Sequence, residues 1–174
     1  LNDKHWENMF VIFATKKGMV RKNKLIDVAR SGKRELRDNG KLAIKLDAKD
    51  SLIGVKLCTK DDDILLSSSN GKCLRFPVEK LRLFSGLNSS GVKGIKLDKS
   101  NTIISLSILK HSTIDMNIRK EYLKASSDNR KTSSELTNEF EELNKNEEFL
   151  LSVTSRGFGK RSSAYEYRIS IRGG

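Results

Sequence analysis

Few residues of the kinds that build metal sites or disulfide frameworks occur in this chain of 174 residues. It contains two cysteines, Cys58 and Cys73, and two histidines, His5 and His111. The cysteine spacing matches neither a disulfide framework nor a zinc site, so we expect free thiols, as in a reducing cytoplasm. The histidines stand without ligand spacing or a triad. The sequence therefore predicts no metal site and no cofactor bound by this chain.

Motifs of enzymatic chemistry are also missing. There is no phosphate-binding loop of the GxxxxGK(S/T) type. The three tyrosines, Tyr122, Tyr165 and Tyr167, have no arginine arrangement of the kind that surrounds a nucleophilic tyrosine. The consecutive aspartates at 61–63 point different ways on a strand and indicate a solvated turn. We expect no catalytic residue in this chain.

Long apolar runs are absent, since none approaches the roughly 18 residues of a membrane span, and no signal peptide is visible. Hydrophobic residues make up 36% of the chain and aromatic residues 6%, with one proline and twelve glycines. This composition suits a small core with many tight turns. The chain begins at Leu1 and ends at Gly174 in mid-pattern, so we interpret it as an excerpt of a longer protein.

Basic residues are abundant: 34 Lys and Arg stand against 22 Asp and Glu, a formal charge of +12. Such a balance indicates a polyanionic partner, with nucleic acid the first candidate and an anionic membrane surface the second. The charge is uneven, because residues 111–148 hold six basic and nine acidic residues, a net charge of −3, and the rest carries +15. We predict an acidic insertion at 111–147, partly helical around Glu135, Glu139, Phe140 and Leu143 and away from any polyanion-binding face.

A repeat organises the remainder of the chain. At an offset of 51 residues, Ile44–Asp47 matches Ile95–Asp98, and the apolar pattern that follows is kept. A second motif precedes each copy: an apolar strand, a polar turn closed by Gly18, Gly71 or Gly157, and a strand with basic residues three or four positions on. Such turns predict hairpins. The 86-residue gap between Gly71 and Gly157 falls to 48 without the 38 residues of 111–148, which restores the period.

Units of about 50 residues with four strands each predict an all-β, propeller-like fold. We place one blade at 8–58, a second at 59–110, the insertion at 111–147 and the start of a further blade at 148–174. The alternative is an unrelated β-sandwich whose internal similarity is accidental.

The motifs resemble the C-terminal DNA-wrapping domain of the A subunit of bacterial DNA gyrase and its topoisomerase IV relative. The blocks that carry the resemblance are Ala14–Arg21, Gly40–Leu46, Ser51–Val55, Asn70–Phe76, Gly91–Leu97 and Arg156–Arg161. The resemblance implies a β-pinwheel, a disc of six four-stranded blades with strands exchanged between neighbours. This chain would hold the second and third blades and about half of the fourth. The family's signature glycine-rich box would lie outside it, and the acidic insertion departs from the family pattern.

The resemblance also implies a function. The domain would bend duplex DNA around a basic rim and so support ATP-dependent negative supercoiling by the full enzyme. The cleaving tyrosine, ATP and Mg²⁺ would belong to other parts of that enzyme. Its partners would be double-stranded DNA and, in the full gyrase, a B subunit together with another copy of the A subunit. We expect no membrane partner and a place in the bacterial cytoplasm, at the nucleoid. The alternatives are the topoisomerase IV domain, and a propeller-like scaffold that binds an acidic protein or an anionic membrane.

Basic residues at repeated positions would neutralise phosphates along such a rim. We expect the contacts to come from Arg21, Lys22, Lys24, Lys33, Arg34, Arg37, Lys41, Arg75, Lys80, Arg82, Lys93, Lys160, Arg161, Arg168 and Arg172. We also expect Arg21, Arg75 and Arg161 to lie along a single border. Gly86, Gly91 and Gly94 either serve turns or let backbone N–H groups approach phosphates.

Overall fold

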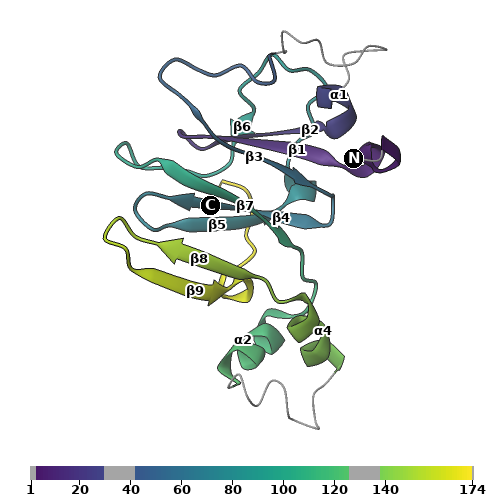
Figure 1. Cartoon of the computed structure of the whole chain (residues 1–174), viewed down its shortest axis with the longest axis vertical. Coiled ribbons are helices and arrows are strands. Elements are labelled where there is room, and N and C mark those ends of the chain that lie inside the picture. The colour runs from purple at the N-terminus through teal and green to yellow at the C-terminus, as the bar shows by residue number, and fades with distance from the viewer. Residues whose placement is uncertain (1–2, 30–41, 126–137, 174) are drawn as a thin grey trace. The chain divides into compact units, whose positions relative to one another are not determined.

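The computed structural model describes residues 3–29, 42–125 and 138–173 (Figure 1). The chain divides into two compact units. The first consists of Leu1–Ile108 and Ile169–Gly174, and the second of Leu109–Arg168. No helix within the described ranges is long and apolar enough to cross a membrane.

Three hairpins share one turn geometry. They join β1 (Phe10–Thr15) to β2 (Met19–Lys24), β4 (Asp62–Ser68) to β5 (Cys73–Pro77), and β8 (Phe149–Val153) to β9 (Gly159–Ser163). In each turn the N–H of Gly18, Gly71 or Gly157 donates to the carbonyl three residues back at 2.9 Å. The glycines have φ between 81° and 83°, which favours glycine because a Cβ is strained there. The predicted hairpins are confirmed.

The first sheet of unit 1 draws strands from two repeats. Its order is β3-β1-β2-β6, with β3 at Leu52–Cys58 and β6 at Val92–Lys93. Strand β6 belongs to the second repeat, yet it pairs with β2 of the first (Figure 1). This exchange between neighbours confirms the expected pinwheel arrangement.

The second sheet has the order β5-β4-β7, with β7 at Ile103–Lys110. The outer edge of β5 is bordered by residues near the end of the chain. Arg75 forms a parallel bridge with Ile169, as Lys22 does with Leu83. The N–H of the following residue, Ser170 or Phe84, then donates to the carbonyl of Arg75 or Lys22 at 2.8 Å. In both repeats, therefore, a segment of the next repeat lies along the outer strand of the hairpin.

The core of unit 1 gathers alternate apolar side chains of the two sheets. Ile12, Val20, Ile64 and Phe76 are fully buried in one cluster, and burial of apolar area is the main stabilising term. A smaller cluster of Val11, Phe13 and Ile44 lies under α1 (Leu25–Ala29). The short 3-10 helices η1 (Asp3–Asn8) and η2 (Val78–Lys80) complete this unit.

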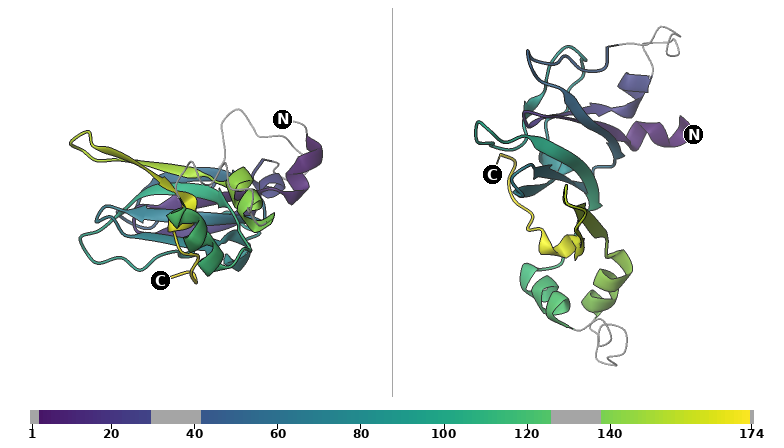
Figure 2. Two further views of the ribbon diagram at one scale, coloured as in Figure 1. Left: turned by 90° about the horizontal axis from the view of Figure 1, so that it is seen from below. Right: turned by 60° about the vertical axis from the view of Figure 1, so that its left-hand side comes forward.

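Unit 2 contains helices α2 (Met116–Lys124) and α4 (Asn138–Asn146), the β8–β9 hairpin and η3 (Ala164–Glu166). The two helices lie side by side (Figure 2). Tyr122 packs edge-on against Phe140 and Tyr165, with ring centroids 5.6 and 6.0 Å apart. Phe140 and the buried Leu143 lie on α4, which confirms the helix expected there, while Glu135 lies outside the described residues.

The β8–β9 hairpin presents apolar side chains to solvent. Leu151 is 73% exposed, whereas Leu65 and Ile12 at the corresponding positions of the other hairpins are 1% and 0% exposed. Strand β9 pairs with β8 alone in the described part of the chain. The third hairpin therefore lacks the cover that the first two have.

Candidate nucleic-acid interface

Three basic residues expected to contact a polyanion lie in the interior. Arg21, Lys22 and Arg75 are 0%, 6% and 1% exposed. The Nζ of Lys22 donates to the Val78 carbonyl at 2.8 Å, and the Nε of Arg75 donates to Asp63 Oδ2 at 2.7 Å. Their burial contradicts the expected direct contacts, and it removes Arg21 and Arg75 from any exposed border. The reason is the segment of the next repeat that borders each hairpin.

A basic residue nevertheless recurs at one position of all three hairpins. Lys22, Arg75 and Arg161 each follow the turn glycine by four residues and pair with Ile12, Leu65 and Leu151. The side chain of each also contacts a residue at the start of the neighbouring strand, namely its first or second residue. Lys22 Nζ lies 5.3 Å from the centre of the Phe10 ring, Arg161 Cζ lies 4.6 Å from that of Phe149, and Arg75 pairs with Asp63. Only Arg161 is exposed. The recurrence therefore reflects hairpin packing in the first two repeats.

Arg21 holds a loop of the second repeat against β2. Its guanidinium donates to the carbonyls of Gly86, Leu87 and Ser89, the last two at 2.7 Å. The side-chain amide of Asn23 donates to Phe84 O at 2.6 Å. The segment from Arg82 to Lys93 thus runs along the outer edge of β2, where Leu83 bridges Lys22 and Lys93 pairs with Met19.

Exposed cations do line this edge. Arg82 is exposed and its guanidinium lies over the Phe84 ring at 5.1 Å. Lys93 is exposed on β6, and the exposed Arg172 donates from Nη1 to the Lys93 carbonyl at 2.5 Å. We call Arg82, Lys93 and Arg172 the border cations. Leu83 and Ile169 are the residues that form the bridges to the two hairpins, and each directly follows an arginine, Arg82 or Arg168. A cation therefore recurs immediately before the bridging residue in both repeats.

Further lysines that the sequence analysis did not single out lie near Lys93. Exposed Lys16 and Lys17 belong to the first turn, where the Gly94 N–H donates to Gly18 O at 2.8 Å. Exposed Lys96 donates its N–H to Gly173 O at 3.2 Å. No local sequence pattern signals this cluster, because three remote segments form it.

The other predicted residues within the described ranges lie on several different elements. Lys24 at the end of β2, Lys80 in η2 and Lys160 on β9 are exposed. Lys160 Nζ lies 3.9 Å from Glu166 Oε2. Arg168 lines a hollow of unit 2 with Arg119 and Lys120. The remaining predictions, which lie outside the described residues, are Lys33, Arg34, Arg37 and Lys41.

The glycines of this region serve packing. A Cβ on Gly91 would lie 2.2 Å from the Val20 carbonyl oxygen, and one on Gly94 would lie 2.7 Å from Val20 Cγ1. Only Gly86 faces open space among the three glycines named from the sequence. Close backbone packing therefore requires Gly91 and Gly94, which are not placed to admit a phosphate.

Two buried ionisable side chains near β2, Cys58 and Lys22, have shifted pKa values because they are removed from water. Desolvation raises the pKa of Cys58 to about 12, and Asp62 adds to the effect while Lys22 opposes it. Desolvation also lowers the pKa of Lys22 from its ordinary value. The described residues include no group of three or more His, Cys, Asp or Glu able to hold a metal ion.

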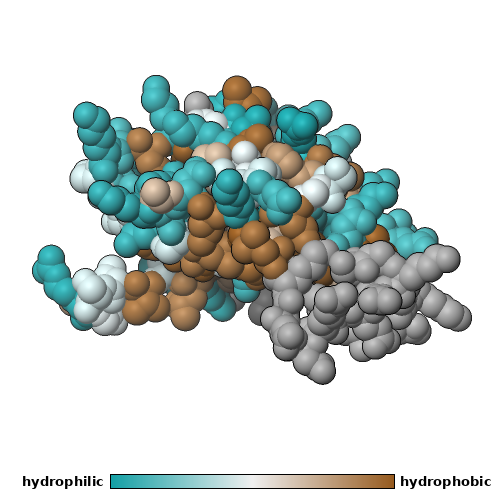
Figure 3. Space-filling model, turned by 90° about the horizontal axis from the view of Figure 1, so that it is seen from above, coloured by the Kyte–Doolittle hydropathy of each residue, from teal (hydrophilic) through white to brown (hydrophobic). Residues whose placement is uncertain are grey.

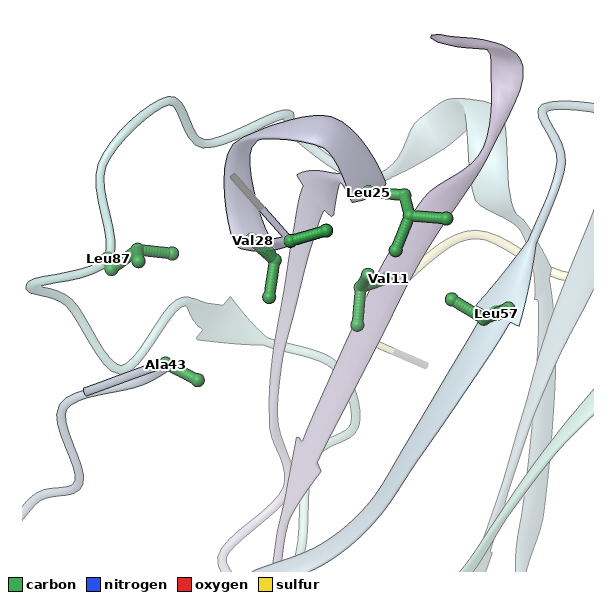
Figure 4. A pocket seen from close by; sticks show the side chains of 7 residues that line it. Val11, Leu25, Val28, Ala43, Leu57 and Leu87 are labelled. Carbon is green, nitrogen blue, oxygen red and sulfur yellow. The ribbon is translucent and has the colours of Figure 1, made fainter. Parts of the chain in front are cut away.

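The surface also carries an apolar area. Figure 3 shows apolar side chains gathered in the middle of one face, with hydrophilic side chains around them. A hollow of about 410 Å³ is lined by side chains of β1, α1, β3 and the loop after η2, among them Val11, Leu25, Leu57 and Leu87, which face a common space (Figure 4). Its lining contains no titratable group among the described residues, so it offers no acid or base for catalysis.

Comparison with known proteins decides the family. A family model described as the DNA gyrase C-terminal domain, beta-propeller, matches residues 34–59, 62–110 and 148–174. The chain belongs to this gyrase C-terminal domain family. The matched residues leave out 111–147, the stretch that carries α2 and α4.

Curated relatives of the gyrase domain agree with this assignment. The DNA gyrase A subunit of Rickettsia bellii is 41% identical over 186 residues, which cover 99% of this chain and 20% of that protein. The corresponding gyrase protein of Granulibacter bethesdensis is 40% identical, with coverages of 97% and 20%. The chain spans about 20% of the length of these relatives.

Solved structures support the pinwheel fold. The C-terminal domain of DNA topoisomerase IV superposes with a TM-score of 0.67 at 22% identity, covering 99% of this chain and 41% of that one. A DNA gyrase A C-terminal domain gives a TM-score of 0.65 at 18% identity, with coverages of 96% and 42%. At these identities the likeness concerns the fold alone. The family model and the curated relatives named above are gyrases, so the topoisomerase IV alternative is not favoured.

Proposed function

We propose that this gyrase domain binds the backbone of duplex DNA without reading its sequence. The observation that carries the proposal is the row of border cations beside β2, all three of them exposed. Lys and Arg neutralise phosphates and release counterions, which gives strong, salt-dependent affinity. Contacts of this kind position a protein on DNA but carry no base information. The net charge of +12 adds a long-range attraction toward a polyanion.

We further propose that the domain bends the duplex around its edge. Wrapping needs cations at positions that recur from repeat to repeat. The recurring cation is the one before each bridge to a hairpin, Arg82 in one repeat and Arg168 in the next. In this proposal Arg82 and Arg168 provide the recurring phosphate contacts that were first expected from the basic residues four positions after the turn glycines. Two of those residues, Lys22 and Arg75, are buried.

Within a full enzyme the chain would serve DNA gyrase, a topoisomerase, as part of its A subunit. The name of the relatives supports this role. We propose that its partners there are a B subunit plus another copy of the A subunit, in the bacterial cytoplasm at the nucleoid. Cleavage of DNA and hydrolysis of ATP with Mg²⁺ would take place elsewhere in that assembly, and no catalytic residue is proposed in this chain.

Two measurements test binding and wrapping separately. In a mobility-shift titration with linear duplex, we expect tight binding at low salt that weakens steeply as salt rises. Absence of binding at low salt, or affinity indifferent to salt, would refute the proposal. For wrapping, nicked plasmid is ligated with and without the chain. We expect the linking number to change with protein, and an unchanged linking number at saturating protein would leave binding without wrapping.

A further inference from the structure

Arg21 is a buried cation that has no carboxylate partner. Its side chain is fully buried, and no carboxylate oxygen lies within 4 Å of its guanidinium in the described part of the chain. Its partners are the carbonyls of Gly86, Leu87 and Ser89 and the face of the Phe84 ring, 5.7 Å away. Desolvation lowers the pKa of Arg21 from its ordinary value. A buried charge without a counter-ion is costly, so this arrangement calls for a reason beyond packing.

The hairpin does not require a cation at this position. The register places Arg21 opposite Phe13 and Leu74 opposite Leu66, each three residues after its turn glycine. Leu74 is a buried apolar side chain. The neighbouring repeat therefore fills the same place without charge, while its own buried cation, Arg75, has Asp63 beside it. At this position of the hairpin, three residues after the turn glycine, a charge is therefore found only where a loop is held, in the first of these two repeats.

Peptide geometry determines what that loop presents to solvent. In a planar trans peptide the C=O and the following N–H point in opposite directions. The carbonyls of Gly86, Leu87 and Ser89 point inward at Arg21, so the N–H groups of Leu87, Asn88 and Ser90 point outward. No backbone partner for these three N–H groups occurs among the described residues. The loop is exposed or half-exposed along 85–90, and oriented N–H groups of this kind attract anions.

We propose that residues 84–90, which we call the Arg21 loop, bind a phosphodiester of the DNA backbone through the N–H groups of Leu87, Asn88 and Ser90. The peptide units relay the charge of Arg21, which never touches the ligand. Arg82 stands beside the loop with an exposed guanidinium on the Phe84 ring and supplies the direct charge. This inference rests on the proposed function, because it names the place where one DNA phosphate sits.

Variants of Asn88 test the loop without touching its support. Asn88→Pro removes one N–H and Asn88→Asp adds a carboxylate at the phosphate. We expect each to weaken duplex binding at low salt by about three- to tenfold, the effect of one hydrogen bond or one exposed charge. Asn88→Ala keeps the N–H and is the matched control, with affinity within about twofold of the original chain.

The outcomes separate this inference from the proposed function. If the original chain does not bind duplex, the proposed function fails. If it binds and Asn88→Asp binds equally well, the Arg21 loop is not a contact. In case Asn88→Pro fails to fold, amide NMR signals of the original chain give a second readout. We expect those of Leu87, Asn88 and Ser90 to shift with duplex. A shift with inorganic phosphate alone, at matched ionic strength, also supports an anion site, whereas signals unmoved by either ligand would overturn it.

Discussion

The Arg75–Asp63 ion pair offers the sharpest test of how the repeats are held together. Its Nε–Oδ2 distance is 2.7 Å, and the two side chains are 1% and 0% exposed. Replacing Arg75 with Met keeps the apolar volume but leaves the Asp63 carboxylate buried without this partner. Removing one member of a buried pair costs about 3–5 kcal/mol in the free energy of unfolding. Since small domains have about 5–15 kcal/mol in total, Arg75→Met should remove a large share of the stability.

Urea denaturation followed by circular dichroism measures this loss, because urea, unlike guanidinium, does not screen charge. At a slope of about 2 kcal/mol per M, we expect the midpoint to fall by about 1.5–2.5 M. The double variant Arg75→Met with Asp63→Leu removes both charges. Its free energy of unfolding should lie within about 1 kcal/mol of that of the original chain. The control is Lys72→Met, which breaks the 3.5 Å contact with Asp98 on the surface and should cost less than about 1 kcal/mol.

Two results would refute the reasoning about this pair. One is a loss below about 1 kcal/mol for Arg75→Met, which would mean that water or another group compensates the carboxylate. The other is a double variant as unstable as the single one. That result would assign the loss to packing around Arg75 instead of to the buried carboxylate that has lost this cation.

Two further predictions concern backbone packing and thiol chemistry. Gly91→Ala should lower the free energy of unfolding by at least about 2 kcal/mol, because the φ of Gly91 is +98° and an added Cβ would lie 2.2 Å from the Val20 carbonyl oxygen. The control is Gly86→Ala, whose Cβ would meet no atom and which should change that free energy by less than about 1 kcal/mol in the same urea titration. Equal losses in the two variants would contradict the packing argument. Cys73 is exposed, whereas Cys58 is buried with its pKa raised to about 12. At about pH 8 we therefore expect iodoacetamide to label Cys73 and not Cys58, as measured by mass spectrometry. Equal labelling rates of the two thiols at this pH would contradict the burial of Cys58.

The parts of the fold that depend on local chemistry could be predicted from the sequence. Gly18, Gly71 and Gly157 close three similar turns because each needs a positive φ that glycine adopts without strain. Helix α4 could be expected because Phe140 and Leu143 lie three residues apart in a polar stretch and so share one face.

The fate of the basic residues could not be predicted in the same way. A lysine or arginine after a turn glycine looks the same whether it is exposed or buried. Arg75 is buried because Asp63 and the remote Ile169 meet it, and Arg21 because the carbonyls of a loop 65 residues away surround it. Asp63 belongs to the same hairpin as Arg75, but Ile169 and the loop carbonyls come from remote segments of the next repeat, and no local pattern encodes where those segments lie. The exposed row at Arg82, Lys93 and Arg172 has the same origin.

The most direct test of the DNA-binding edge compares two lysines on opposite edges of one sheet. Lys93 lies on β6 and Lys56 on β3, both are exposed, and the sheet order is β3-β1-β2-β6. Each is replaced by Gln, and duplex affinity is measured by fluorescence anisotropy over a range of salt concentrations. We predict that Lys93→Gln makes the slope of log affinity against log salt shallower by about 0.9, the effect of one phosphate contact, and that Lys56→Gln leaves it unchanged. Equal effects of the two variants, or a larger effect at Lys56, would contradict the account.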